Sequence, residues 1–94
     1  MLIRIADEVI FRVLGEEAVI LNLATSRYFG LNSVGTRLWQ LIAAHGSEEK
    51  VIEAFLAEYE VGERQLRQDL ADLIQQLTQK GLVQSETPKT SQAV

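Results

Sequence analysis

The fold is decided by one continuous stretch, which reads VIFRVL at residues 9–14, GEE at 15–17, AVILNL at 18–23, ATS at 24–26 and RYFGL at 27–31. Its three longer runs are rich in β-branched and aromatic residues, which favour strands. The polar segments between them are so short that neighbouring strands must be antiparallel, so we predict a three-stranded meander. Alternation predicts apolar faces made by Val9, Phe11 and Val13, and by Val19, Leu21 and Leu23.

The chain after this meander has the periodicity of amphipathic helices. A first helix is expected from an N-cap at Asn32 or Ser33 to about residue 45, where Gly46 ends it. A second follows Ser47, and a third runs from about residue 63 to 80 before Gly81 as its C-cap. The apolar stripe of the third helix consists of Leu66, Leu70, Leu73, Ile74 and Leu77.

These elements predict an α+β, winged-helix-like fold in which an N-terminal three-stranded antiparallel meander precedes three α-helices. We expect one domain over residues 1–84, with Leu82 and Val83 folding back onto its core. Residues 85–94 are polar and contain the only proline, so a disordered C-terminal tail is expected there.

Composition excludes several classes of function. The net charge of −4, from 9 basic and 13 acidic residues, disfavours nucleic acid and anionic membrane surfaces as partners. The chain has 0 cysteines, which excludes disulfides, thiolate metal sites and thiol catalysis, and fits a cytoplasmic location. No apolar run is long enough to span a bilayer, and the N-terminus lacks the pattern of a signal peptide.

The sequence offers little for catalysis, so we expect no enzyme activity, no cofactor and no metal. The single histidine, His45, lies at a predicted helix end, where a cation suits the helix dipole. It has no partner ligand of the kind that a metal site needs. Ser26, Ser33 and Ser47 lie at turns and helix caps, where serine is expected for structural reasons.

Peptide binding has more support. The third strand of a meander is an edge, which presents unpaired N–H and C=O groups to another chain. This edge, Arg27 to Leu31, has no proline, and Gly30 would let another backbone approach closely. A partner strand would gain affinity from main-chain hydrogen bonds and specificity from side-chain pockets. The opposing interpretation is that the edge is covered by its own chain, and that the third-helix stripe is all core.

The run from Ala18 to Gly35, followed by Arg37-Leu38-Trp39, closely resembles the PqqD-like family. This family comprises small RiPP recognition elements, among them the stand-alone leader-binding proteins of lasso-peptide gene clusters. The similarity covers most of residues 9–84 and is specific only in the central motif. One departure is Ser26, where the family usually has glycine in the turn.

The resemblance implies three strands, three helices and no catalytic residue. It also implies that the leader of a ribosomally made precursor peptide adds as a strand on the third strand and packs over the third helix. The protein would then present the leader to a modifying enzyme, either a leader peptidase and cyclase pair or a radical SAM protein. The peptide-binding residues carried over by position are Arg27, Tyr28, Phe29, Gly30, Leu31, Leu66, Arg67, Leu70, Leu73, Ile74 and Leu77.

Two alternatives remain open from the sequence. A winged-helix DNA-binding regulator would use the third helix for recognition, although Arg64, Arg67 and Lys80 are balanced there by acidic residues. A scaffold module would instead pair its exposed edge with a second copy, so the chain is expected to be a monomer or a weak or swapped dimer.

Overall fold

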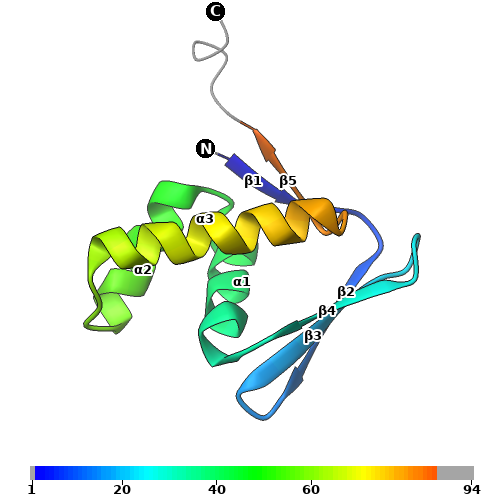
Figure 1. The fold of residues 1–94 in the computed structure, drawn as a ribbon, viewed down its shortest axis with the longest axis horizontal. Helices are drawn as coiled ribbons and strands as arrows, with labels where there is room; N and C mark the ends of the chain where they lie inside the picture. The colour runs from blue at the N-terminus through cyan, green and yellow to red at the C-terminus, as the bar shows by residue number, and fades with distance from the viewer. Residues whose placement is uncertain (1, 87–94) are drawn as a thin grey trace, which may run out of the picture.

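The computed structural model describes residues 2–86 and confirms an α+β fold with strands first and helices after them (Figure 1). The strands are β1 (Leu2–Ile5), β2 (Val9–Leu14), β3 (Glu17–Asn22), β4 (Arg27–Leu31) and β5 (Val83–Glu86). The helices are α1 (Ser33–His45), α2 (Glu48–Glu58) and α3 (Glu63–Gln79). Strands β2, β3 and β4 form the predicted antiparallel meander in that spatial order.

A second, two-stranded sheet, which was not predicted from the sequence, joins the ends of the described chain. Strand β1 pairs antiparallel with β5, from Leu2 opposite Glu86 to Ile5 opposite Val83. The burial of Leu82 and Val83 confirms that this segment folds back onto the core. The expected disorder of residues 85–94 is wrong at residues 85 and 86, because β1 supplies main-chain partners from the far end of the sequence. Residues 87–94 lie outside the described part.

The meander packs one face against the helices and leaves the other open. Phe11, Ile20 and Phe29 stand in one cross-strand row, and Ile20 is fully buried beneath the helices. The predicted apolar face of the second strand was therefore the wrong one, because Ala18 and Ile20 face the core while its other set faces outward. Both faces of β3 are apolar, so only pairing with the neighbouring strands could decide between them.

The helices enclose one hydrophobic core. Trp39 of α1 is buried and stacks on Phe11 of β2, with ring centroids 6.1 Å apart. Figure 1 shows α3 crossing the other helices on its way to β5. Val13, which was expected on the core face, lies near the end of β2 and is 50% exposed.

Within residues 2–86, no helix combines the length and apolar character needed to cross a membrane.

The helix ends mostly follow the expected capping chemistry. The Asn32 side chain accepts a hydrogen bond from the Gly35 amide at 2.8 Å, so Asn32 is the N-cap of α1. Gly46 ends this helix in the left-handed conformation, with φ of 66°. Ser47 precedes α2, but its side chain makes no capping hydrogen bond. Helix α3 has its C-cap at Lys80 rather than at the predicted glycine, which follows it.

Asn22 is a buried polar residue that joins two distant turns. Its amide nitrogen donates to the Gly81 carbonyl at 3.0 Å. Its amide oxygen accepts from the Ala24 and Thr25 amides at 2.9 and 3.3 Å. Because buried polar groups are costly unless they are hydrogen-bonded, this side chain fixes the β3–β4 turn against the end of α3.

Ser26 in the same turn has a left-handed φ of 61°, which is unfavourable for a residue with a Cβ atom. Replacing Ser26 with Gly is expected to raise the free energy of unfolding by about 0.5 kcal/mol, since relief of strain exceeds the entropic cost of glycine. Urea denaturation would measure this change. The matched control Thr25→Gly, at a neighbour without positive φ, is expected to destabilise the protein. Equal effects of both substitutions would contradict the strain at Ser26.

Candidate functional site

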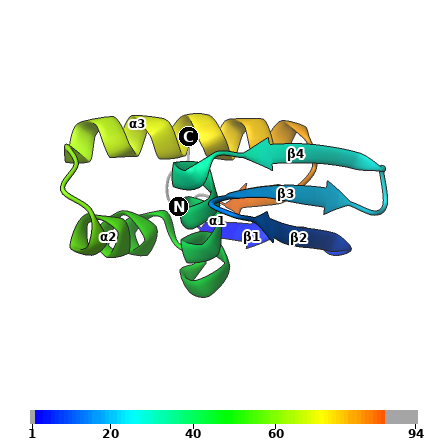
Figure 2. The same ribbon diagram turned by 90° about the horizontal axis from the view of Figure 1, so that it is seen from below.

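Strand β4 has a free edge that faces α3. It pairs with β3 along one side, and no other strand within residues 2–86 pairs with its second side. Figure 2 shows β4 as the strand of the meander that lies next to α3. An unpaired edge of this kind presents main-chain donors and acceptors that another extended chain can complete.

A cleft of about 440 Å³ opens between this edge and the helices. Strand β4, the start of α1 and the middle of α3 all contribute to it. Its lining residues are Phe29, Gly30, Leu31, Asn32, Val34, Gly35, Leu38, Asp69, Asp72, Leu73 and Gln76. A Cβ atom on Gly35 would meet Leu31 Cδ2 at 3.1 Å, so glycine lets α1 begin close against β4.

The α3 side of the cleft is acidic. The Asp69 carboxylate accepts a hydrogen bond from the Gln65 side chain at 2.8 Å, and the Asp72 carboxylate accepts one from Gln68 at 3.0 Å. The residues that line the cleft include neither Lys nor Arg. Its chemistry therefore suits a peptide main chain with apolar side chains and opposes a phosphate backbone.

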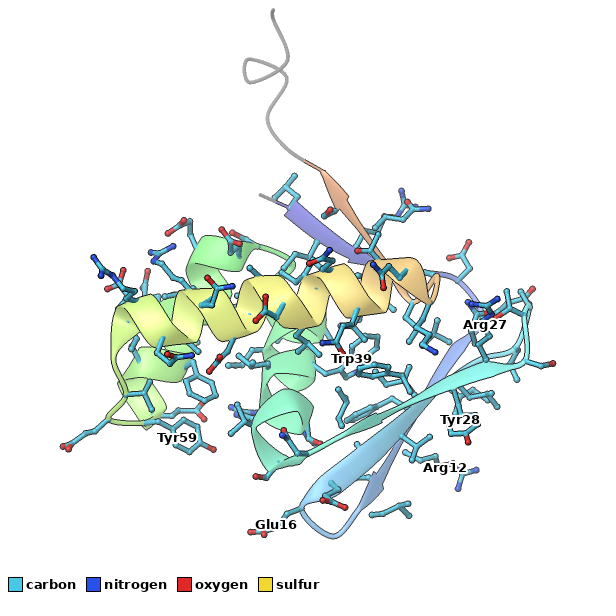
Figure 3. All side chains as sticks on the ribbon, viewed as in Figure 1. Arg12, Glu16, Arg27, Tyr28, Trp39 and Tyr59 are labelled. Carbon is cyan, nitrogen blue, oxygen red and sulfur yellow. The ribbon has the colours of Figure 1, made fainter. Side chains whose placement is uncertain are left out.

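The predicted strand residues divide between the two faces of β4. Phe29, Gly30 and Leu31 line the cleft, and so does Leu73 of α3. Tyr28 lies on the opposite face of the sheet, is 70% exposed and points away from the helices (Figure 3). Arg27 begins the strand, is exposed and does not line the cleft.

Most of the predicted third-helix wall does not line this cleft. Four of its apolar residues are at most 4% exposed, belong to the core and do not line the cleft. These residues are Leu66, Leu70, Ile74 and Leu77. The physical reason is that α3 needs a full apolar stripe to cover both the other helices and the sheet, so only Leu73 at the stripe's margin reaches the cleft.

Arg67 also points elsewhere than expected. Its guanidinium donates to the Glu49 carboxylate of α2 at 3.2 and 3.3 Å and to Glu63 at 2.9 Å. The hydrogen bond from Arg67 holds the pKa of Glu49 below its usual value. Arg67 thus connects α3 to α2 at an exposed position and takes no part in the cleft.

Several lining residues were missed by the sequence analysis. The start of α1 contributes Val34, Gly35 and Leu38, which the sequence indicated only as part of the first helix. Asp69 and Gln76 lie beside the predicted apolar stripe of α3. This position is the one feature of the sequence that could have indicated that they line the cleft. No group of three or more potential metal ligands occurs within residues 2–86.

Comparisons with known proteins agree with this geometry. No curated protein matches the chain. The solved structure of TbiB1 in complex with the TbiA(beta) leader peptide is 34% identical, with a TM-score of 0.81, over 90% of this chain and 99% of that one. A lasso peptide synthetase B1 complexed with the leader peptide is 22% identical and has a TM-score of 0.77, over 90% and 100% of the two chains, a likeness of fold. The family model for coenzyme PQQ synthesis protein D (PqqD) matches residues 17–83, from the start of β3 to the start of β5, so the chain belongs to the PqqD family.

Proposed function

We propose that this protein binds the leader segment of a ribosomally synthesised precursor peptide and presents it to a modifying enzyme. The observation that carries the proposal is the second edge of β4, which no strand within residues 2–86 pairs, beside an open cleft. A leader added to this edge becomes a fourth strand of the meander. Its main chain then supplies affinity that depends little on sequence, and its side chains supply specificity.

Alternation of side chains gives the leader two distinct sets of contacts. Side chains on one face enter the cleft, where Phe29, Val34 and Leu73 offer apolar surface. Side chains on the other face project onto the open side of the sheet. The 34% identical TbiB1 structure, described as a complex with a leader peptide, supports this use of the fold.

Presentation requires no catalytic group on this protein. Binding the leader raises the local concentration of the attached core segment near the enzyme, as any tether does. The partner is a leader peptidase and cyclase pair, or a radical SAM protein. The likeness to a lasso peptide synthetase B1 supports the first. We propose the cytoplasm as the site of the encounter, because ribosomes make the precursor there.

The open face of the sheet is the surface that remains for the enzyme. Ile10, Leu21 and Tyr28 form one cross-strand row on it, and Ile10 and Tyr28 are 39% and 70% exposed. Arg12 stands beside this row and forms no salt bridge within residues 2–86. Exposed apolar surface around a free cation suits a partner protein that offers apolar side chains and a carboxylate.

The DNA-binding alternative finds no support in the geometry. The recognition helix would be α3, whose Arg67 already engages two carboxylates and whose cleft side carries Asp69 and Asp72.

Pairing of the β4 edge with a second copy would compete with the leader for the same groups. Light scattering over a range of concentrations would detect such pairing as an increase in mass.

Binding of a fluorescently labelled leader tests the proposal. The probe is the N-terminal, leader half of the peptide encoded by the nearest short open reading frame, with its C-terminal, core half as the matched control. Anisotropy is expected to show saturable binding of the leader half and none of the core half. Binding of the core half alone, or of neither half, would contradict leader recognition.

A further inference from the structure

Two walls of the leader cleft are joined, beyond one end of the cleft, by the side chain of Asn22. Strand β4 begins at Arg27, directly after the β3–β4 turn, and α3 ends at Gln79, directly before the turn that contains Gly81. Asn22 is 4% exposed and forms hydrogen bonds to both turns. It pairs with Arg27, two residues before Phe29 of the cleft, but does not itself line the cleft.

On one side, Asn22 holds the end of α3. The Gly81 amide donates to the Thr78 carbonyl at 3.0 Å, and the Leu82 amide donates to the Leu77 carbonyl at 2.9 Å. These hydrogen bonds fold the turn back onto the last turn of the helix, so the Gly81 carbonyl is fixed to α3. The Asn22 amide nitrogen donates to that carbonyl at 3.0 Å.

On the other side, Asn22 holds the start of β4. Its side-chain oxygen accepts from the Ala24 and Thr25 amides, and its main-chain carbonyl accepts from the Ser26 amide at 2.8 Å. These three hydrogen bonds define the path of the chain into β4. One buried amide group therefore links β4 to α3.

We propose that Asn22 is a positioning residue for leader binding, which fixes β4 and α3 at the separation that an added strand requires. The inference rests on the proposed strand addition. An added strand lies about 4.8 Å from β4, and its cleft-facing side chains must reach α3 at the same time. Without the link, the end of α3 moves relative to β4, and binding has to restore the spacing at a cost in affinity.

Asn22→Asp breaks the link on one side only. The introduced carboxylate still accepts from the Ala24 and Thr25 amides but opposes the Gly81 carbonyl. Near neutral pH, the affinity for the labelled leader half is expected to fall about tenfold, the usual effect of one buried acceptor left without its donor. Lowering the pH through the pKa of the introduced carboxyl is expected to restore affinity, because the protonated group again donates to Gly81.

The variant is expected to fold, because main-chain hydrogen bonds hold the same turns. The Leu23 amide donates to the Glu8 carbonyl at 2.9 Å, and the Ala6 amide donates to the Leu82 carbonyl at 3.0 Å. Thermal unfolding would establish the temperature range in which wild type and variant are both folded. The ratio of their affinities at each pH removes any titration of the leader itself.

A matched control separates positioning from stability. Val51→Ala truncates a fully buried residue of α2 that does not line the cleft. It is expected to lower the unfolding temperature and to leave leader affinity within about twofold. If folded Asn22→Asp bound the leader as wild type does, or if its affinity did not recover once the carboxyl was protonated, the positioning role would be overturned. If wild type itself did not bind the leader, leader capture would fail as well.

The wild-type protein offers a second measurement that needs no variant. Coupling between two sites is reciprocal, so a link that favours leader binding must be stabilised by the bound leader. Hydrogen exchange of the Ala24 and Thr25 amides, which donate to Asn22 and lie outside the cleft, is expected to slow when leader saturates the protein. Unchanged exchange of both amides at saturation would refute the coupling.

Discussion

Replacing Leu70 with Ala is expected to lower the free energy of unfolding by about 2–5 kcal/mol, the usual cost of such a truncation at a fully buried position. Leu70 is 0% exposed in the middle of α3. The whole stability of a domain of this size is about 5–15 kcal/mol, so the variant should be close to unfolding at moderate temperature.

Fluorescence of Trp39 during urea denaturation would measure the effect, because it is the only tryptophan and is buried against Phe11. The control is Gln75→Ala, an exposed position on the same helix, which is expected to change stability by less than about 0.5 kcal/mol. Were Leu70→Ala to weaken leader binding while leaving stability intact, Leu70 would line the leader site, as the sequence had predicted, and its placement in the core would be wrong.

Replacing Leu73 with Asp is expected to reduce leader affinity about 100-fold. Leu73 is half-buried at the margin of the core and lines the cleft together with Asp69 and Asp72. A third carboxylate there would be covered by the leader without a cation to pair with, and burying an unpaired charge costs several kcal/mol.

The matched control for this substitution is Gln75→Asp, which adds the same charge to α3 at an exposed residue outside the cleft. It is expected to leave leader affinity within about twofold, since exposed charges interact weakly through water. Thermal unfolding of both variants would separate loss of binding from loss of fold. Equal losses of affinity in the two variants would show that net charge matters and the cleft does not.

The order of elements could be read from the sequence because it depends on local patterns. Short polar turns defined the meander, and apolar residues repeating every three or four positions defined the helices. Asn32 and Gly46 marked both ends of α1 through capping chemistry that involves only near neighbours. Such signals are local, so they can be recognised without knowledge of the tertiary structure.

The parts that were missed depend on contacts between distant segments. Strand β1 pairs with β5 across the whole described chain, and no local feature of residues 83–86 distinguishes a strand from a polar tail. The core-facing side of β3 was misassigned because Val19 and Leu21 are as apolar as Ala18 and Ile20. Only the pairing with β2 and β4, and the helices above them, selects one face.

In the candidate site, too, some residues follow from local patterns and others depend on contacts between distant segments. The edge position of β4 follows from the order of strands, so Phe29, Gly30 and Leu31 were indicated by sequence. How α3 shares its stripe between core and cleft depends on its rotation against the sheet, which periodicity does not determine. Leu73 alone of the predicted helix residues reaches the cleft, and the contribution of α1 through Val34 and Leu38 had no separate signal.

NMR measurements on the labelled protein test the central claim most directly. Amide chemical shifts and hydrogen exchange would be followed during titration with the leader of the nearest short open reading frame. Strand addition predicts saturable shifts at Arg27–Leu31, at Leu38 and around Leu73. It also predicts new exchange protection of those β4 amides that point away from β3. Shifts confined to α2 or the β1–β5 sheet, with exchange in β4 unchanged, would contradict leader capture at this edge.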